Sequence, residues 1–155
     1  MSIARLRPAD WLTGIAGLAS LLLLWAPWYG VSDGTINGWQ AFGLIDVFVL
    51  VTALLGIATL LVTAVRDTPE LPVMMDVVTA PIASLTALLV LIRLLDLPYA
   101  EVTTGREWGV FAGTVAVVLT AAGAWMAMRD EHAPGLRPNP EARTLPAPRA
   151  GAGGS

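Results

Sequence analysis

The chain contains no cysteine, no lysine and only one histidine. Without cysteine it forms no disulfide, and it offers no thiolate to zinc, to an iron–sulfur cluster or to a substrate. Charged residues make up only 14% of the 155 positions, whereas a soluble domain carries roughly 25%. Hydrophobic residues make up 55%, so the chain lacks the polar side chains that cover a globule in water. We therefore expect lipid to be its main solvent.

The few ionisable side chains exclude further kinds of site. The net charge is -3, and no basic stripe is interleaved with aromatic residues, so we expect no nucleic-acid partner. His132 lies beyond the last apolar run, so neither a histidine-ligated metal site nor a Ser-His arrangement can form among those runs. The sequence also lacks a glycine-rich phosphate loop. We predict no metal, no cofactor, no catalytic residue and no enzymatic activity.

Four apolar runs are long enough, at about 20 residues each, to cross a hydrocarbon core of about 30 Å. They cover residues 11–28, 42–65, 73–95 and 108–128. We therefore predict an all-α fold, an integral membrane four-helix up-down bundle over 11–128. Residues 1–10 form a cytoplasmic N-terminus in this prediction. Residues 129–155, rich in Pro, Ala, Gly and Arg, form a disordered cytoplasmic tail.

The arginines set the predicted orientation, because short loops rich in basic residues stay cytoplasmic. Only Arg106 lies in a loop on one side of the four predicted spans, and most other arginines lie on the opposite side. We therefore expect a multi-pass protein of the cell inner (plasma) membrane with both termini cytoplasmic.

Aromatic residues gather at the outer ends of the predicted spans, at the depth where such rings anchor helices to lipid headgroups. They are Trp25, Trp28, Tyr29, Trp39, Tyr99 and Trp108. A binding site formed by the outer tryptophans is the alternative to anchoring. In the same region, Asp33-Gly34 and Asn37-Gly38 are turn-forming pairs that allow a miniature β-hairpin in the first outer loop.

The two halves of the chain share a short pattern. Pro27-Trp28-Tyr29 followed by Trp39 resembles Pro98-Tyr99 followed by Trp108. If this is a duplication, the bundle consists of two helical hairpins related as a parallel repeat. Chance similarity between apolar spans flanked by aromatic residues is the alternative, and the sequence leaves both open.

Small residues mark the predicted packing faces, because helices in lipid attract one another through close backbone approach. The candidates are Gly14 and Gly17 in the first run, Gly56 in the second, and Gly109 and Gly113 in the fourth. The pattern predicts a packing face without naming the partner.

Three ionisable residues lie within or at the edges of the runs, where each needs a partner, water or an interfacial position. Asp46 and Arg93 fall at similar depths near the outer ends, so we predict a salt bridge between them, with Asp96 and Arg106 as competing partners. Asp76 lies near the cytoplasmic start of the third run. These charges are either structural or part of the path of a small carrier.

The segment Trp25-Ala26-Pro27-Trp28-Tyr29, followed by Gly38-Trp39, resembles small uncharacterised bacterial four-transmembrane-helix proteins with this first outer loop. It is also loosely similar to the Ser-Pro-Trp (SPW) membrane repeat, with Ala26 in place of the serine. The resemblance implies location and architecture, and brings no activity with it.

We therefore expect a non-enzymatic structural, assembly or accessory subunit. Its expected partners are the lipid bilayer and either further copies of itself in a homo-oligomer or a larger membrane complex. The alternative is a small solute or proton-coupled ion carrier that uses Asp46, Asp76 and Arg93.

Overall fold

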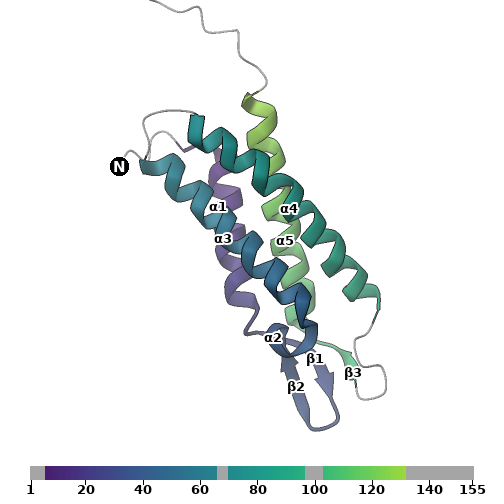
Figure 1. Cartoon of the computed structure of the whole chain (residues 1–155). Helices are drawn as coiled ribbons and strands as arrows, with labels where there is room; N and C mark the ends of the chain where they lie inside the picture. The colour runs from purple at the N-terminus through teal and green to yellow at the C-terminus, as the bar shows by residue number, and fades with distance from the viewer. Residues whose placement is uncertain (1–5, 66–69, 97–102, 132–155) are drawn as a thin grey trace, which may run out of the picture.

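The computed structural model describes residues 6–65, 70–96 and 103–131, which are mainly helical (Figure 1). Most of them belong to the long helices α1 (Pro8–Leu23), α3 (Leu44–Val65), α4 (Glu70–Leu95) and α5 (Trp108–Glu131). The short helix α2 (Gly38–Phe42) and the strands β1 (Pro27–Val31), β2 (Gly34–Asn37) and β3 (Thr103–Arg106) lie together at one end.

The long helices pack side by side around a shared core. Helix α1 lies against α3 and α5, and α4 lies against the same two helices. Helices α1 and α4 end near the sheet, whereas α3 and α5 begin there (Figure 1). The start of α1 and the end of α5 therefore lie at the same end of the molecule, away from the sheet.

The first apolar run is not helical over its expected length of 11–28. Helix α1 begins at Pro8, ends at Leu23 and has 16 residues, or about 24 Å at 1.5 Å per residue. The N–H groups of the next three residues bond to carbonyls three positions back, and Pro27 has no N–H with which to continue the helix. Among the described residues, α3, α4 and α5 are long and apolar enough to cross a membrane, and α1 is a shorter apolar helix.

The other three runs correspond to helices with shifted ends. Helix α3 begins at Leu44, two residues later than expected, because Gly43 adopts a φ of +58° and separates it from α2. Helix α4 begins at Glu70 rather than at 73 and continues through Pro81, and α5 extends to Glu131.

The sheet is antiparallel, with strand order β2-β1-β3. Strands β1 and β2 form the hairpin that the sequence allows, with Val31 opposite Gly34, whose φ is +139°. Strand β3 was not expected and pairs with the other edge of β1, so Tyr29 lies opposite both Ile36 and Arg106. The prediction of an all-α fold therefore describes the long elements and omits this sheet.

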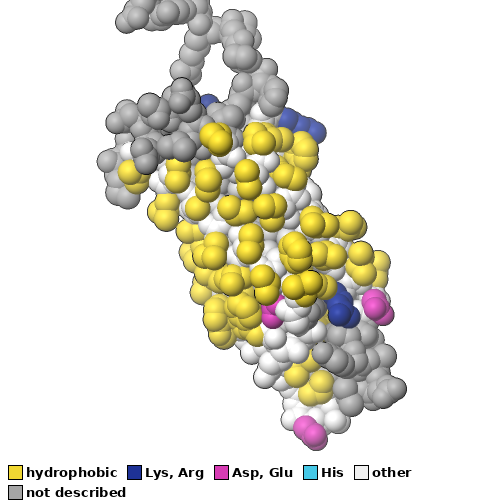
Figure 2. Space-filling view, viewed as in Figure 1, with side chains coloured by type: hydrophobic (Ala, Val, Ile, Leu, Met, Phe, Trp, Pro, Cys, Tyr) yellow, Lys and Arg dark blue, Asp and Glu magenta, His cyan; other side chains and the backbone are white. Residues whose placement is uncertain are grey.

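The space between the helices is filled largely by small and hydroxyl-bearing side chains, together with a few valines. The buried residues of α4, for example, include Thr79, Ala80, Ala83 and Thr86. Large apolar side chains point outward instead, and in Figure 2 they cover the middle of the visible face, with charged side chains towards its two ends. Larger buried side chains occur in a cluster that includes Trp28 and Tyr29 of the sheet.

Candidate functional site

Two neighbouring aromatic residues of β1 attach the sheet to the helices. Trp28 is fully buried, and its indole N–H donates to the carbonyl of Leu23, the last residue of α1, at 2.6 Å. Tyr29 is also fully buried, and its hydroxyl donates to the carbonyl of Arg93 in the last turn of α4 at 2.9 Å. Strand β1 is therefore bonded to the ends of two different helices.

Trp28 and Tyr29 do not face outward as anchoring residues of an aromatic belt would, because both are fully buried. Trp28 and Tyr29 instead fill the end of the core, because their polar atoms reach helix carbonyls that have no partner within the helix. Trp25 and Trp108 do lie on the surface, 61% and 58% exposed, and half-buried Trp39 packs edge-to-face against Trp25 at a ring-centroid distance of 5.6 Å. Tyr99 lies outside the described residues.

Arg106 of β3 completes the attachment of the sheet to α4. Its Nε donates to the carbonyl of Leu94 at 2.7 Å, and its Nη2 donates to the carbonyl of Leu95 at 2.9 Å. Together with the Tyr29 hydroxyl, these bonds satisfy three consecutive carbonyls at the helix end, where positive charge is also favoured by the helix dipole. No pattern in the sequence indicates this role of Arg106, because the role depends on the pairing of β3 with β1.

The predicted salt bridge between Asp46 and Arg93 does not form within the described residues. Asp46 is buried in the first turn of α3, where its Oδ1 accepts a hydrogen bond from the N–H of Val47 at 2.7 Å. A carboxylate is favoured there by the helix dipole, so its own helix provides the stabilisation that we had assigned to Arg93. The half-buried guanidinium of Arg93 has no hydrogen-bond or ion-pair partner among the described residues.

Two pairs of threonines join α3 to α4. The hydroxyl oxygens of Thr52 and Thr86 lie 2.8 Å apart, and those of Thr59 and Thr79 lie 3.4 Å apart. The two pairs are seven residues apart along each helix, or about 10.5 Å. They are therefore two separate contacts between the helices and do not form a continuous chain of hydroxyls. Such interhelical contacts hold helices together in lipid.

Asp76 lies near the cytoplasmic-side start of α4 in the predicted orientation and is only 1% exposed. It precedes Thr79 of the nearer threonine pair by one turn of the helix. Asp76 was among the predicted site residues, whereas Thr79 and Thr86 were not. The seven-residue spacing of threonines, which occurs in both helices, could have indicated them.

The glycines of α1 and α3 lie where these helices approach each other. A Cβ on Gly17 would lie 3.0 Å from the carbonyl oxygen of Ala53 and 3.3 Å from the Cα of Gly56, and one on Gly14 would collide with the side chain of Leu60. These three predicted packing glycines therefore face a neighbouring helix.

The two predicted packing glycines of α5, Gly109 and Gly113, lie against β1. Gly109 lies against the backbone carbonyl of Pro27, and Gly113 lies against the ring of Trp28. Both accommodate β1 rather than a helix. Gly123, which the packing prediction did not include, is the α5 glycine that meets a helix, because a Cβ there would lie 2.8 Å from the backbone nitrogen of Thr13 in α1.

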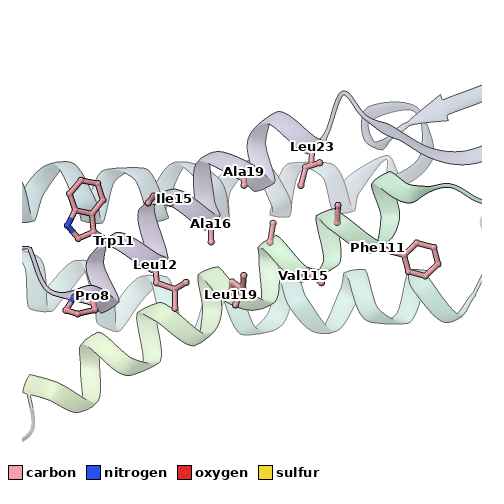
Figure 3. Close-up of a pocket in the computed structure, with 12 residues that line it drawn as sticks. Pro8, Trp11, Leu12, Ile15, Ala16, Ala19, Leu23, Phe111, Val115 and Leu119 are labelled. Carbon is pink, nitrogen blue, oxygen red and sulfur yellow. The ribbon is translucent and has the colours of Figure 1, made fainter.

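An outward-facing groove of about 690 Å³ runs between α1 and α5 (Figure 3). Pro8 and Trp11 lie at one end of the groove, and Leu23 and Phe111 lie at the other (Figure 3). All twelve lining residues are hydrophobic, so the groove offers little to orient a polar substrate.

Burial raises the pKa of Tyr29 to about 12, and the nearby guanidiniums of Arg93 and Arg106 oppose this shift. The hydroxyl therefore remains a hydrogen-bond donor to α4 at physiological pH. Because the unfolded chain loses this proton near the ordinary value of 10.0, the stability from the neutral hydroxyl is complete below that pH and is lost as the pH rises towards 12.

The late ionisation of Tyr29 can be measured directly, because the chain has only two tyrosines. In a Tyr99→Phe variant in detergent, we expect the ultraviolet absorbance of tyrosinate to rise with a midpoint near 12 rather than 10.0. The same variant unfolded in denaturant should titrate at the ordinary value and serves as the reference. A folded-state midpoint at the ordinary value would contradict the burial of this hydroxyl.

No protein-family model matches the chain, and searches of curated proteins and of solved structures find no match to it. The resemblance to the Ser-Pro-Trp repeat therefore stays a prediction, and the function is argued from the arrangement of side chains alone.

Proposed function

We propose that this chain is a non-enzymatic integral membrane protein that acts as a structural, assembly or accessory subunit. The observation that carries the proposal is the distribution of side-chain size. Small and hydroxyl-bearing residues are buried between the helices, whereas large apolar residues such as Leu54, Leu88 and Val115 are exposed. In water such a surface drives aggregation, whereas in lipid small residues and interhelical hydroxyl contacts are what hold helices together.

In the proposed arrangement, α1, α3, α4 and α5 form an up-down bundle in the inner (plasma) membrane. Arg7 and Arg129 lie at the end of the molecule away from the sheet, so we assign that end to the cytoplasm and the sheet to the outer surface. Helix α1, at about 24 Å, is shorter than the hydrocarbon core of about 30 Å. Local thinning of the bilayer or oligomerisation accommodates such a mismatch.

An accessory role is supported by how the interior hydroxyls are already used. Thr59, Thr79 and Thr86 each donate to the carbonyl four residues earlier in the same helix. With about 10.5 Å between the two threonine pairs, these hydroxyls provide no connected route for a proton. The burial of Asp76 favours the second candidate function, a proton-coupled carrier, because an acid inside a membrane is costly unless it has a purpose.

Both candidate functions can be tested with one preparation of the full chain. We expect the protein to remain in the membrane fraction after alkaline extraction and to require detergent for release. A reporter fused after Ser155 should behave as cytoplasmic. In reconstituted vesicles, a pH gradient should decay no faster than in empty vesicles, and Asp76→Asn should not change the rate.

Release without detergent would contradict membrane integration. A gradient that decays faster with the wild-type protein than with Asp76→Asn would overturn the accessory role and support the carrier.

A further inference from the structure

We infer that Arg93 and Arg106 form a binding site for the phosphate group of an anionic phospholipid in the leaflet next to the sheet. The inference rests on the proposed membrane location and adds a specific ligand to it. Three features of the described residues carry it: two arginines at one helix end, N–H groups on both that have no partner among those residues, and an exposed apolar stripe on α4 that ends at Leu95, whose carbonyl Arg106 bonds.

Both arginines lie where the sheet is attached to α4, and both guanidiniums are near enough to Tyr29 to influence it electrostatically. Arg106 bonds to the carbonyls of Leu94 and Leu95, the two residues that follow Arg93 in the helix. Tyr29 lies opposite Arg106 in the sheet and donates to the Arg93 carbonyl. The backbone of Arg93 and the side chain of Arg106 are therefore fixed at the end of α4 by the same set of hydrogen bonds.

Both side chains retain N–H groups for a ligand. The Arg93 guanidinium makes no hydrogen bond within the described residues, although the residue is half-buried. Arg106 uses its Nε and Nη2, which leaves its Nη1 available. Around Tyr29, the two guanidiniums of Arg93 and Arg106 are accompanied by the carboxylate of Asp96, which is exposed. Arginine binds phosphate through paired, charge-assisted hydrogen bonds.

The outer face of α4 supplies the second half of a lipid site. Leu85, Leu88, Ile92 and Leu95 are exposed and follow a spacing of three or four residues, so they form one apolar stripe on the helix. The stripe ends in the turn that carries Arg93. A phospholipid matches both parts, because its acyl chains lie along the stripe while its phosphate reaches the arginines. Inorganic phosphate matches only the charged part.

The test measures lipid binding to the purified full chain by native mass spectrometry, with phosphatidylglycerol as the anionic probe and phosphatidylcholine as the zwitterionic one. We expect the wild type to prefer phosphatidylglycerol, and Arg93→Gln to weaken that binding by about tenfold, the equivalent of one charge-assisted hydrogen bond. Arg93→Lys keeps the charge but not the paired donors, so it should lose part of the affinity.

Arg129→Gln is the matched control, since it removes the same charge at the other end of the molecule and should leave binding unchanged. Equal binding of the two lipids, or an equal loss in Arg129→Gln, would overturn the inference. Displacement of the lipid by inorganic phosphate at millimolar concentration would show a phosphate site without a lipid requirement, and would overturn it too. Alkaline extraction of membranes that contain Arg93→Gln shows whether the variant is still integrated. Loss of lipid binding can then be distinguished from loss of membrane integration.

Discussion

Replacement of Gly113 by leucine is expected to leave only a small fraction of the protein folded. A Cβ at this position of α5 collides with the ring of Trp28, which is fully buried and is already hydrogen-bonded to Leu23. The ring must leave its site, and the loss of a buried tryptophan from a core costs about 3–5 kcal/mol. Because Trp28 also holds the sheet against α1, we expect β1 to detach from the helices.

The measurement is the thermal unfolding midpoint in detergent together with the yield of monodisperse protein on size exclusion. Gly105→Leu is the matched control, because no atom lies within 4 Å of a Cβ added at Gly105. Trp28→Ala in the Gly113→Leu background should recover part of the stability, since the two side chains then no longer compete for one space. A Gly113→Leu variant as stable as Gly105→Leu would contradict the burial of Trp28.

Replacement of Gly56 is the second change with a large expected effect. A Cβ there lies 2.8 Å from the backbone carbonyl oxygen of Thr13, 3.2 Å from the Thr120 side chain and 3.4 Å from the Cα of Gly17. Backbone atoms cannot rotate away, so α1 and α3 must separate. We expect Gly56→Ala to destabilise the protein by about 1–3 kcal/mol, and Gly56→Leu by more.

The measurement is equilibrium unfolding in mixed detergent micelles. The free energy of unfolding should decrease from glycine to alanine to leucine at position 56. Gly105→Ala and Gly105→Leu give the corresponding series at an open position and should show little change. If Gly56→Ala unfolds at the wild-type midpoint, the close approach of α1 to α3 is not a source of stability.

Helices α3, α4 and α5 were predictable because a long apolar run in lipid has few alternatives to a helix. Helix α1 was predicted too long, since hydropathy counts Trp25 and Trp28 as membrane residues in any backbone conformation. The residues that end it act through bonds that hydropathy does not represent, namely the missing N–H of Pro27 and the bond from the Trp28 indole to Leu23.

The hairpin of β1 and β2 was predictable from the sequence, whereas β3 was not. Turn-forming pairs at Asp33-Gly34 and Asn37-Gly38 indicated the hairpin, and Asn37 also caps α2 through its bond from the N–H of Gln40. Strand β3 has four polar or small residues and no alternation, so it is a strand only because β1 presents an edge to it. The role of Arg106 follows from that pairing and was therefore beyond the sequence.

The candidate site residues show the same limit. Small residues correctly indicated faces of close approach at Gly17 and Gly56, but whether Gly113 meets a helix, a lipid or an aromatic ring depends on where β1 lies. The Asp46–Arg93 pair was inferred from depth alone, which does not include the backbone N–H that Asp46 finds beside it.

Strand β1 has a mechanical consequence. Trp28 and Tyr29 are consecutive residues, yet one is bonded to α1 and the other to α4, which face each other across the core with α3 and α5 between them. Strand β1 therefore links two helices that lie on opposite sides of the core. A force applied to the hairpin of β1 and β2 would therefore act on α1 and α4 at once, and both helices would transmit it to the end of the molecule away from the sheet.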